Sequence, residues 1–285
     1  MTRIHSTAII DPAAKIDPTV QIGPGCIIQG PVQIGAGTRL ICRVTLDGAV
    51  HIGQRNVLYP QVCIGFAPQH REFDPKTEGS GVTLGNENIL REGVTIHRAS
   101  GPTPTTIGDR NYLMVNSHLG HDVQMGNEGT LANGALVGGH CTLGDRVLIG
   151  GNAGVHQFCR MGRLSIISGA AGIVKDLPPF CCVYALRCLG SLNLVGLRRA
   201  RLHPHIDALN HAFDLLYRNQ HSNAIAIKLI EQQLGHDPLC MELAEFVRTT
   251  KRGITSHVAS NGTEEPQIHS ESKITNELSK AISHP

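Results

Sequence analysis

Five histidines in the middle of the chain are the residues whose type is best suited to chemistry, and one of them, His121, is followed directly by Asp122. An imidazole titrates near neutral pH, so it can accept a proton under physiological conditions. A neighbouring carboxylate can orient the ring and stabilise the imidazolium that forms. The pair is therefore suited to general-base catalysis, provided that the fold brings further polar groups beside it. The five histidines are His97, His118, His121, His140 and His156.

A six-residue repeat is the element that must position these histidines. Every sixth residue is aliphatic over residues 4–64, and the same spacing returns over 84–96 and 107–173. The next residue is often Gly, and the residue four positions on is usually small. Because side chains alternate along a strand, these large and small positions both point inward. Three hexapeptides close one triangular coil, and stacked coils pair their backbones, so the sequence predicts a left-handed parallel β-helix.

Interruptions of the repeat define the expected organisation of the chain. Extra residues near 66–82 and 98–106 must leave the solenoid as extruded loops. After Ile173 the spacing becomes helical, and Ser222 and Asp237 are suited to cap two helices. We therefore predict a β-helix acyltransferase domain over residues 1–178, a C-terminal α-helical domain over 179–255 and a disordered tail over 256–285, where the chain is polar.

The repeat also predicts which histidines meet, because residues eighteen apart lie on the same side of adjacent coils. One column of inward residues consists of Ile96, Leu119, Val137 and Val155, where Ile96 joins if residues 98–106 are extruded. Each member of this column is followed within three positions by a histidine. We therefore predict that four histidines stack along one outer side, with His118 at the adjacent corner. The stacked histidines are His97, His121, His140 and His156.

Metal binding and simple packing are the alternatives for this column. Histidines in folds of this kind can ligate zinc at a subunit boundary, as in γ-class carbonic anhydrases, which use an H-x4-H spacing. None of the five histidines makes that spacing, and no Cys lies in the column. We predict no metal and no cofactor. Packing of the rings at an interface between subunits remains the alternative to catalysis.

Composition limits the location and the partners. The formal net charge of +2 provides no strong field for nucleic acid or anionic lipid, and the first residues lack the apolar run of a secretory signal. The nine cysteines form no CxxC, and Cys26, Cys141 and Cys159 occupy small inward positions of the repeat, so they are predicted to be reduced. We expect a cytoplasmic protein without nucleic-acid or integral membrane contact.

Four segments carry a resemblance to a known family. They are GVTIHR (93–98), NSHLGHD (116–122), GGH (138–140) and GVHQFCRMG (154–162). Together they resemble the UDP-N-acetylglucosamine O-acyltransferases over roughly residues 1–255. The resemblance implies a homotrimer with active clefts between subunits. It also implies transfer of a (3R)-3-hydroxyacyl group from acyl carrier protein to the 3-hydroxyl of UDP-N-acetylglucosamine, the first step of lipid A biosynthesis.

The resemblance also implies roles for individual residues. His121 would be the general base and Asp122 would orient it, while the backbone N–H of Gly139 would stabilise the oxyanion. Gly169 matches the position whose side-chain size limits the length of the acyl chain, and glycine there would permit a longer chain. The residues implied to bind substrate are His97, His118, His140, His156, Gln157, Asn193 and Arg199.

An altered loop leaves the identity of the substrates open. The family's PQDLKY loop reads PQHREF here (68–73), which places His70 and Glu72 where the family holds the sugar nucleotide. The alternatives are therefore an acyltransferase for another nucleotide sugar, including amide formation on a 3-amino sugar, or an inert or metal-binding trimer. Basic residues of the helical segment could dock the acidic carrier protein or be ordinary solvated charges. They are Arg198, Arg199, Arg201, Lys228, Arg248, Lys251 and Arg252.

Overall fold

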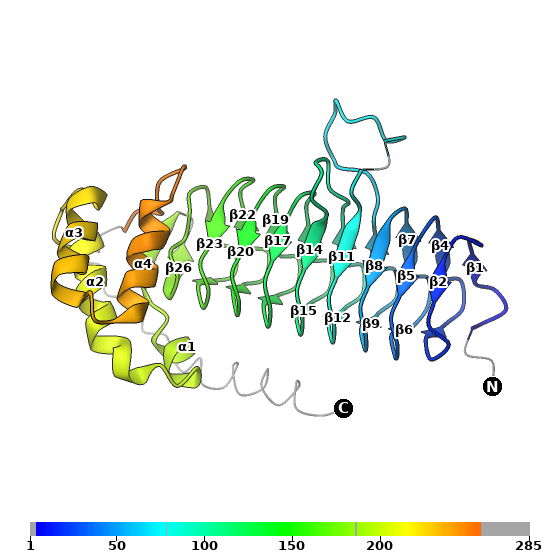
Figure 1. Cartoon of the computed structure of the whole chain (residues 1–285), viewed down its shortest axis with the longest axis horizontal. Helices are drawn as coiled ribbons and strands as arrows, with labels where there is room; N and C mark the ends of the chain where they lie inside the picture. Colours follow the sequence, from blue (N-terminus) through cyan, green and yellow to red (C-terminus); the bar gives the residue numbers. More distant parts are fainter. Residues whose placement is uncertain (1–3, 78, 186, 258–285) are drawn as a thin grey trace.

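The computed structural model describes residues 4–77, 79–185 and 187–257, and its long axis follows a row of stacked coils (Figure 1). The strands of the described residues form three sheets, which are the three walls of a prism. Within each wall, neighbouring strands of the solenoid come from successive coils and pair in parallel, as between the strand pairs Thr95–Ile96 and His118–Leu119. The predicted parallel β-helix is therefore confirmed.

Each wall collects every third strand of the solenoid. The nine-stranded sheet contains β1 (Ile9–Ile10), β4 (Ile27–Gln29), β7 (Thr45–Asp47), β10 (Cys63–Ile64), β13 (Thr95–Ile96), β16 (His118–Leu119), β19 (Leu136–Val137), β22 (Gly154–Val155) and β25 (Gly172–Ile173). The eight-stranded sheet contains β2 (Lys15–Ile16), β5 (Gln33–Ile34), β8 (Val50–Ile52), β11 (Val82–Leu84), β14 (Thr105–Ile107), β17 (Gln124–Met125), β20 (Thr142–Leu143) and β23 (Arg160–Met161). The ten-stranded sheet contains β3 (Gln21–Ile22), β6 (Arg39–Leu40), β9 (Val57–Leu58), β12 (Ile89–Leu90), β15 (Tyr112–Leu113), β18 (Thr130–Leu131), β21 (Leu148–Ile149), β24 (Ile166–Ile167), β26 (Cys181–Ala185) and β27 (Cys188–Leu192).

The core is the inside of the prism. Its aliphatic residues are those of the repeat, such as Ile28, Leu90 and Ile149, and each is fully buried. The small inward cysteines Cys26 and Cys141 are buried with them, as predicted. Burial of this apolar column is the main favourable contribution to folding, and the parallel ladders satisfy the backbone along the axis.

Corners of the coils turn the chain from one wall to the next. Asp122, His140 and Phe158 occupy the same corner in successive coils and have φ angles of 62°, 59° and 66°. This left-handed region is several-fold enriched in Asp and His among non-glycine residues, so the first two positions suit the conformation. The corner therefore presents two polar side chains and one aromatic side chain at regular intervals along the axis.

Extruded loops leave the prism where the repeat was expected to break. The long connection between β10 and β11 and the shorter one between β13 and β14 both project from the same region of the solenoid (Figure 1). The Ser80 hydroxyl donates to the carbonyl of Gly101 at 2.7 Å, so the two loops contact each other.

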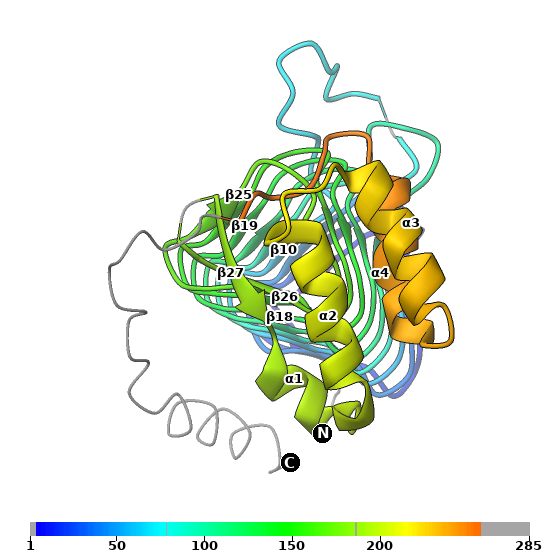
Figure 2. The same ribbon diagram turned by 90° about the vertical axis from the view of Figure 1, so that its left-hand side faces the viewer.

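Helices close the C-terminal end of the prism, as the view along its axis shows (Figure 2). They are α1 (Leu194–Arg199), the 3-10 helix η1 (His203–His205), α2 (Ile206–Tyr217), α3 (Asn223–Leu234) and α4 (Pro238–Arg248). The predicted caps are confirmed, because the side chains of Ser222 and Asp237 accept hydrogen bonds from the first turns of α3 and α4. Helix α1 was not predicted.

The end of the solenoid lies beyond the predicted boundary at residue 178. Strand β26 pairs in parallel with β24 and so continues the ten-stranded wall for one more level. It then pairs antiparallel with β27, and this hairpin leads into the helices. Sequence periodicity missed this strand because KDLPPF interrupts the repeat just before it.

None of the helices in the described ranges has the length and apolar character needed to cross a membrane. Most of the predicted disordered tail, residues 258–285, lies outside the described residues.

Candidate active site

The predicted column of histidines lies along the nine-stranded sheet. Strands β13, β16, β19 and β22 are successive neighbours, and Ile96, Leu119 and Val137 are in direct register. Ile96 therefore keeps its place in the column, and the residues after it are extruded as a loop, as expected. The position of His118 differs from the prediction. It lies within β16, not at a corner, and its Nδ1 is 2.8 Å from the hydroxyl of Thr95 on β13.

His121 and Asp122 form a short hydrogen-bonded pair. Nδ1 of His121 lies 2.6 Å from Oδ2 of Asp122, and the two side chains are only 14% and 11% exposed. Because an ionised carboxylate only accepts hydrogen bonds, Nδ1 carries the proton in this pair. The Nε2 lone pair of His121 is therefore free to accept a proton from a bound molecule.

Backbone and side-chain donors from the loop after β13 surround the same carboxylate. The Ser100 N–H donates to Oδ1 and Oδ2 at 3.1 and 3.0 Å, and the Ser100 hydroxyl donates to Oδ2 at 2.7 Å. The Gly101 N–H donates to Oδ1 at 3.0 Å. Burial opposes ionisation of Asp122, but the hydrogen bonds from Ser100, His121 and Gly101 outweigh it and lower its pKa to about 2. Asp122 is thus an anion at physiological pH.

Gly139 lies one coil above His121, at a position where a side chain would collide with the histidine ring. A Cβ at Gly139 would be 2.8 Å from Nε2 of His121. Among the described residues, the Gly139 N–H donates no hydrogen bond to the protein, whereas its carbonyl accepts one from the Phe158 N–H at 2.9 Å. A free backbone donor beside a basic nitrogen is the arrangement needed to stabilise a developing oxyanion.

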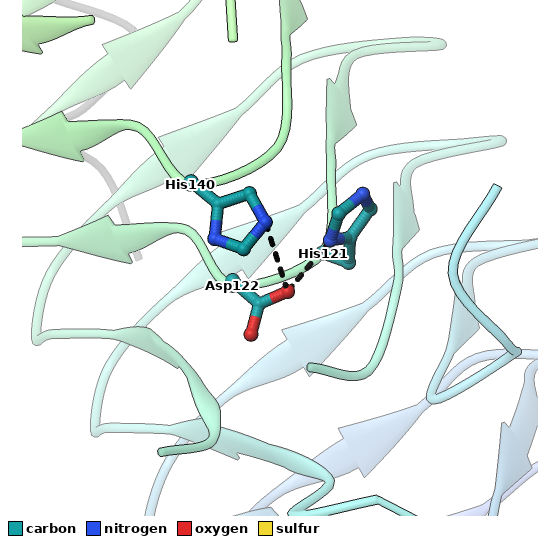
Figure 3. A group of neighbouring side chains, drawn as sticks. All are labelled: His121, Asp122 and His140. Carbon is teal, nitrogen blue, oxygen red and sulfur yellow. Dashed lines mark hydrogen bonds and ion pairs between the residues drawn. The ribbon is translucent and has the colours of Figure 1, made fainter. Parts of the chain in front are cut away.

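His140 extends the cluster along the corner. Its Nε2 lies 3.7 Å from Oδ2 of Asp122, so the carboxylate lies between two imidazoles (Figure 3). The His140 ring meets His121 edge-on with centroids 5.0 Å apart, and it stacks on Phe158 with centroids 4.6 Å apart. The phenyl ring therefore fixes the plane of His140.

His97 and His118, on neighbouring coils, form a second and more buried pair, with ring centroids 5.1 Å apart. Burial, together with His118, His121 and Arg98 nearby, lowers the pKa of His97 to about 4. Burial and His121 also lower the pKa of His118. His97 is therefore neutral at physiological pH, and its Nδ1 is buried without a hydrogen-bond partner in the described part of the chain. This atom is available to a ligand.

Most of these groups line one groove of about 950 Å³ on the outside of the solenoid, whereas Asp122 and His140 contact His121 without belonging to its lining. Of the predicted residues, the groove contains His97, His118, His121, Gly139, His156 and Gln157. It continues over bare backbone at Gly154 and Gly172 to Arg187. The groove thus has a polar region at the histidines and, toward the helical end, a region where glycines expose the backbone.

Three predicted residues lie elsewhere in the single chain. Asn193 caps α1, where its side chain accepts from the Gly196 N–H and donates to the carbonyl of Leu164. Arg199 is exposed in the last turn of α1. Gly169 is an exposed corner residue next to Ala170, which lines the groove. A Cβ at Gly169 would meet its nearest atom, the carbonyl oxygen of Gly151, at 3.5 Å, so the position has room for a side chain.

One group in the described ranges has the donor atoms that a metal ion prefers: those of His121, Asp122 and His140 lie within 4.8 Å of one another. The 2.6 Å hydrogen bond between His121 and Asp122 leaves no space for an ion between these two groups without separating them. Both carboxylate oxygens already accept hydrogen bonds from the loop. The geometry is that of a hydrogen-bonded histidine–carboxylate pair.

Sequence reasoning missed Ser100, Gly101, Phe158 and Gln69. The first two lie in an extruded loop, where the repeat gives no register. Phe158 could have been found, because it follows His140 by one full coil in the same way that His140 follows Asp122. Gln69 lines the groove from the other extruded loop, and it directly precedes the altered residue His70.

Comparison with known proteins agrees with this geometry. A family model described as "Udp N-acetylglucosamine O-acyltransferase; Domain 2" matches residues 176–255. The acyl-[acyl-carrier-protein]–UDP-N-acetylglucosamine O-acyltransferase of Thermodesulfovibrio yellowstonii is 43% identical over 258 residues, which cover 89% of this chain and 99% of that protein.

Solved structures show the same relationship. LpxA from Acinetobacter baumannii superimposes with a TM-score of 0.85 at 37% identity and covers 88% of this chain and 99% of its own. The UDP-N-acetylglucosamine acyltransferase of Francisella novicida has a TM-score of 0.84 at 32% identity, with 90% and 95% covered. These similarities confirm the predicted left-handed β-helix. With a catalytic-type pair in its groove and relatives that match along nearly their whole length, the chain belongs to the UDP-N-acetylglucosamine O-acyltransferase family.

Proposed function

We propose that this protein transfers a (3R)-3-hydroxyacyl group from acyl carrier protein to the 3-hydroxyl of UDP-N-acetylglucosamine, the first step of lipid A biosynthesis. The observation that carries the proposal is the His121–Asp122 pair, whose free Nε2 faces the backbone of Gly139 in an open groove. The names of the relatives supply the substrates. The family's loop differs here at His70 and Glu72, so the identity of the sugar needs a direct test.

The reaction follows from these groups without a covalent enzyme intermediate. Nε2 of His121 takes the proton of the sugar hydroxyl as its oxygen attacks the thioester carbon. The Gly139 N–H stabilises the negative charge on the carbonyl oxygen. As the C–S bond breaks, His121 returns the proton to the thiolate, and the products are an ester and the free carrier thiol. Asp122 stabilises the imidazolium throughout.

The remaining histidines are suited to bind substrate. Neutral His97 can accept or donate a hydrogen bond without the cost of burying a charge. His118 lies beside His97, and His140 lies beside His121. His156 and Gln157 line the groove on the acyl side, where Gly169 would set the chain length.

A homotrimer would complete the site. Leu136 and Phe158 are 53% and 50% exposed on or beside the nine-stranded sheet, next to the histidines, and burial of these large apolar side chains favours contact with a second copy. We infer that such a copy forms the other side of the groove. Asn193 and Arg199, which lie away from the groove in a single chain, would reach substrate only where subunits meet.

The carrier protein would dock on the helical end, which carries the basic residues predicted for this role. Arg198 and Arg199 are exposed in α1, and Lys251 and Arg252 are exposed after α4. We further infer that the enzyme works in the cytoplasm, because Cys26, Cys141 and Cys159, the small inward cysteines of the repeat, form no disulfide within the described part of the chain.

Mass spectrometry of the products tests the reaction. The purified protein would be offered UDP-N-acetylglucosamine or its 3-amino analogue together with hydroxyacyl carrier proteins of several lengths. An ester of the first sugar is expected. Transfer only to the analogue would instead establish amide formation, and no product with any donor would favour the inert scaffold.

Replacement of the base tests the mechanism. His121→Ala should lower kcat by about 10²–10⁴-fold, because positioned general bases contribute about that much. His211→Ala, which removes an exposed histidine of α2, is the matched control and should retain parent activity. Steady-state kinetics on both variants make the comparison, and an unchanged kcat in His121→Ala would rule out this base.

A further inference from the structure

We propose that Ser100 is a positioning residue that sets the proton affinity of the His121–Asp122 pair through its hydrogen bonds to Asp122. The inference rests on the proposed function and extends it to a loop residue outside the histidine column. Within the described residues, the hydrogen bonds that Ser100 donates all go to Asp122, and Ser100 is not part of the groove lining, so we expect it to act through the carboxylate.

The Ser100 hydroxyl shares an acceptor with the catalytic histidine. It donates to Oδ2 of Asp122 at 2.7 Å, and Nδ1 of His121 donates to the same oxygen at 2.6 Å. The two donors therefore compete for one oxygen. Each hydrogen bond to the carboxylate spreads its negative charge and makes it a weaker partner for the imidazolium. Ser100 thus favours the neutral form of His121, which is the form that can accept a proton.

The loop holds Ser100 in place independently of the site. Arg98 and Ala99 before it are buried, and the Ala99 N–H donates to the carbonyl of Gly81. After it, the Gly101 carbonyl accepts from the Ser80 hydroxyl at 2.7 Å. The amide N–H groups of Ser100 and Gly101 fix the other carboxylate oxygen, so loss of the hydroxyl alone leaves the carboxylate oriented.

Other titratable groups around the pair do not supply this effect. His97 and His118 face His121 from β13 and β16, and both have pKa values lowered by burial. His140 approaches the same oxygen only at 3.7 Å, from the corner after β19. Arg98 is buried beside His97, and its guanidinium donates to the carbonyls of Gly65, Pro75 and Thr77.

A pH profile of kcat/KM for Ser100→Ala tests the inference. We expect the acid limb to move to higher pH by about half a unit or more, while the plateau at high pH stays within about twofold of the parent. Activity below the limb should therefore fall by about threefold or more. Ser100→Thr keeps the hydroxyl and should restore the parent profile. A uniform loss at every pH, or an unmoved acid limb, would overturn the inference.

Two further measurements separate the possible failures. Thr19→Ala is the matched control, because Thr19 likewise donates its hydroxyl to a corner aspartate, Asp17, far from the groove. It should change neither activity nor the profile. NMR titration of the His121 ring needs no turnover, and its midpoint should move upward in Ser100→Ala. If the parent transfers no acyl group, the proposed function fails; an active parent with an unmoved midpoint would refute the role of Ser100 alone.

Discussion

His121 and Asp122 lie next to residues of the following coil, eighteen positions later in the chain. The sequence order Gly120, His121, Asp122 is followed one coil later by Gly138, Gly139 and His140. The proposed base therefore lies beneath the backbone of two glycines, and the carboxylate that it contacts lies beneath a second imidazole. Each contact depends on the identity of a single residue, because a coil spacing of about 4.8 Å leaves little space between stacked side chains.

Gly139 gives the sharpest test of this stacking. In Gly139→Ala, the new methyl group would lie 2.8 Å from Nε2 of His121, and the ring must rotate away from Asp122 to avoid it. We expect kcat/KM to fall by about 10²-fold, because a misplaced base loses its alignment with the hydroxyl, with little change in thermal stability. Gly151→Ala is the control, since its Cβ would meet its nearest atom at an ordinary 3.5 Å. Equal activity of the two variants would show that the glycine is not needed for the base.

Sequence reasoning succeeded where the repeat fixes geometry and failed where it does not. His97, His121 and His140 could be placed on one wall because their columns follow from counting coils. Ser100 could not, since its contact with Asp122 depends on the path of a loop with no period. His118 was misplaced by a single position, which moves a residue from a corner into a strand.

The two extruded loops are the elements that complete the site, and Arg98 connects them to the prism. Its guanidinium donates to the carbonyls of Gly65, Pro75 and Thr77, at both ends of the longer loop. Its own backbone continues directly into the loop that holds Asp122. A buried arginine with several carbonyl acceptors is well suited to fix loop geometry, because its planar donors point in set directions.

Loss of the Arg98 hydrogen bonds should increase the mobility of the longer loop without preventing acyl transfer. For Arg98→Met we expect faster proteolysis within residues 66–77 and about a tenfold higher KM for the sugar nucleotide, because Gln69 is carried by this loop, with a smaller change in kcat. Lys76→Met, at an exposed position of the same loop outside residues 68–73, provides the control. A variant that lost kcat and kept its KM would show that the loop serves catalysis rather than binding.

At the scale of the whole molecule, the solenoid and the helices are joined by charged contacts at the end of the prism. Arg163 of the solenoid pairs with Glu242 of α4 at 2.8 Å. Arg160 pairs with Asp176 at 2.8 Å and also donates to the carbonyl of Phe246, whose ring lies 4.3 Å from the guanidinium. The predicted helices were found from their own periodicity, but nothing in that pattern indicated where they dock.

Asp176 makes the Arg160 contact the critical one. The carboxylate is 2% exposed and also accepts from the Thr250 hydroxyl. Arg160→Met would leave it buried without its cation, so the free energy of unfolding should fall by about 3 kcal/mol or more, and the helices should release before the prism. Arg218→Met breaks the exposed pair with Asp214 and should cost less than about 1 kcal/mol. Denaturant unfolding followed by circular dichroism compares the two. Equal free energies of unfolding for the two variants would mean that apolar contacts alone hold the helices on the solenoid. The buried pair of Arg160 and Asp176 would then determine only the orientation of the helices.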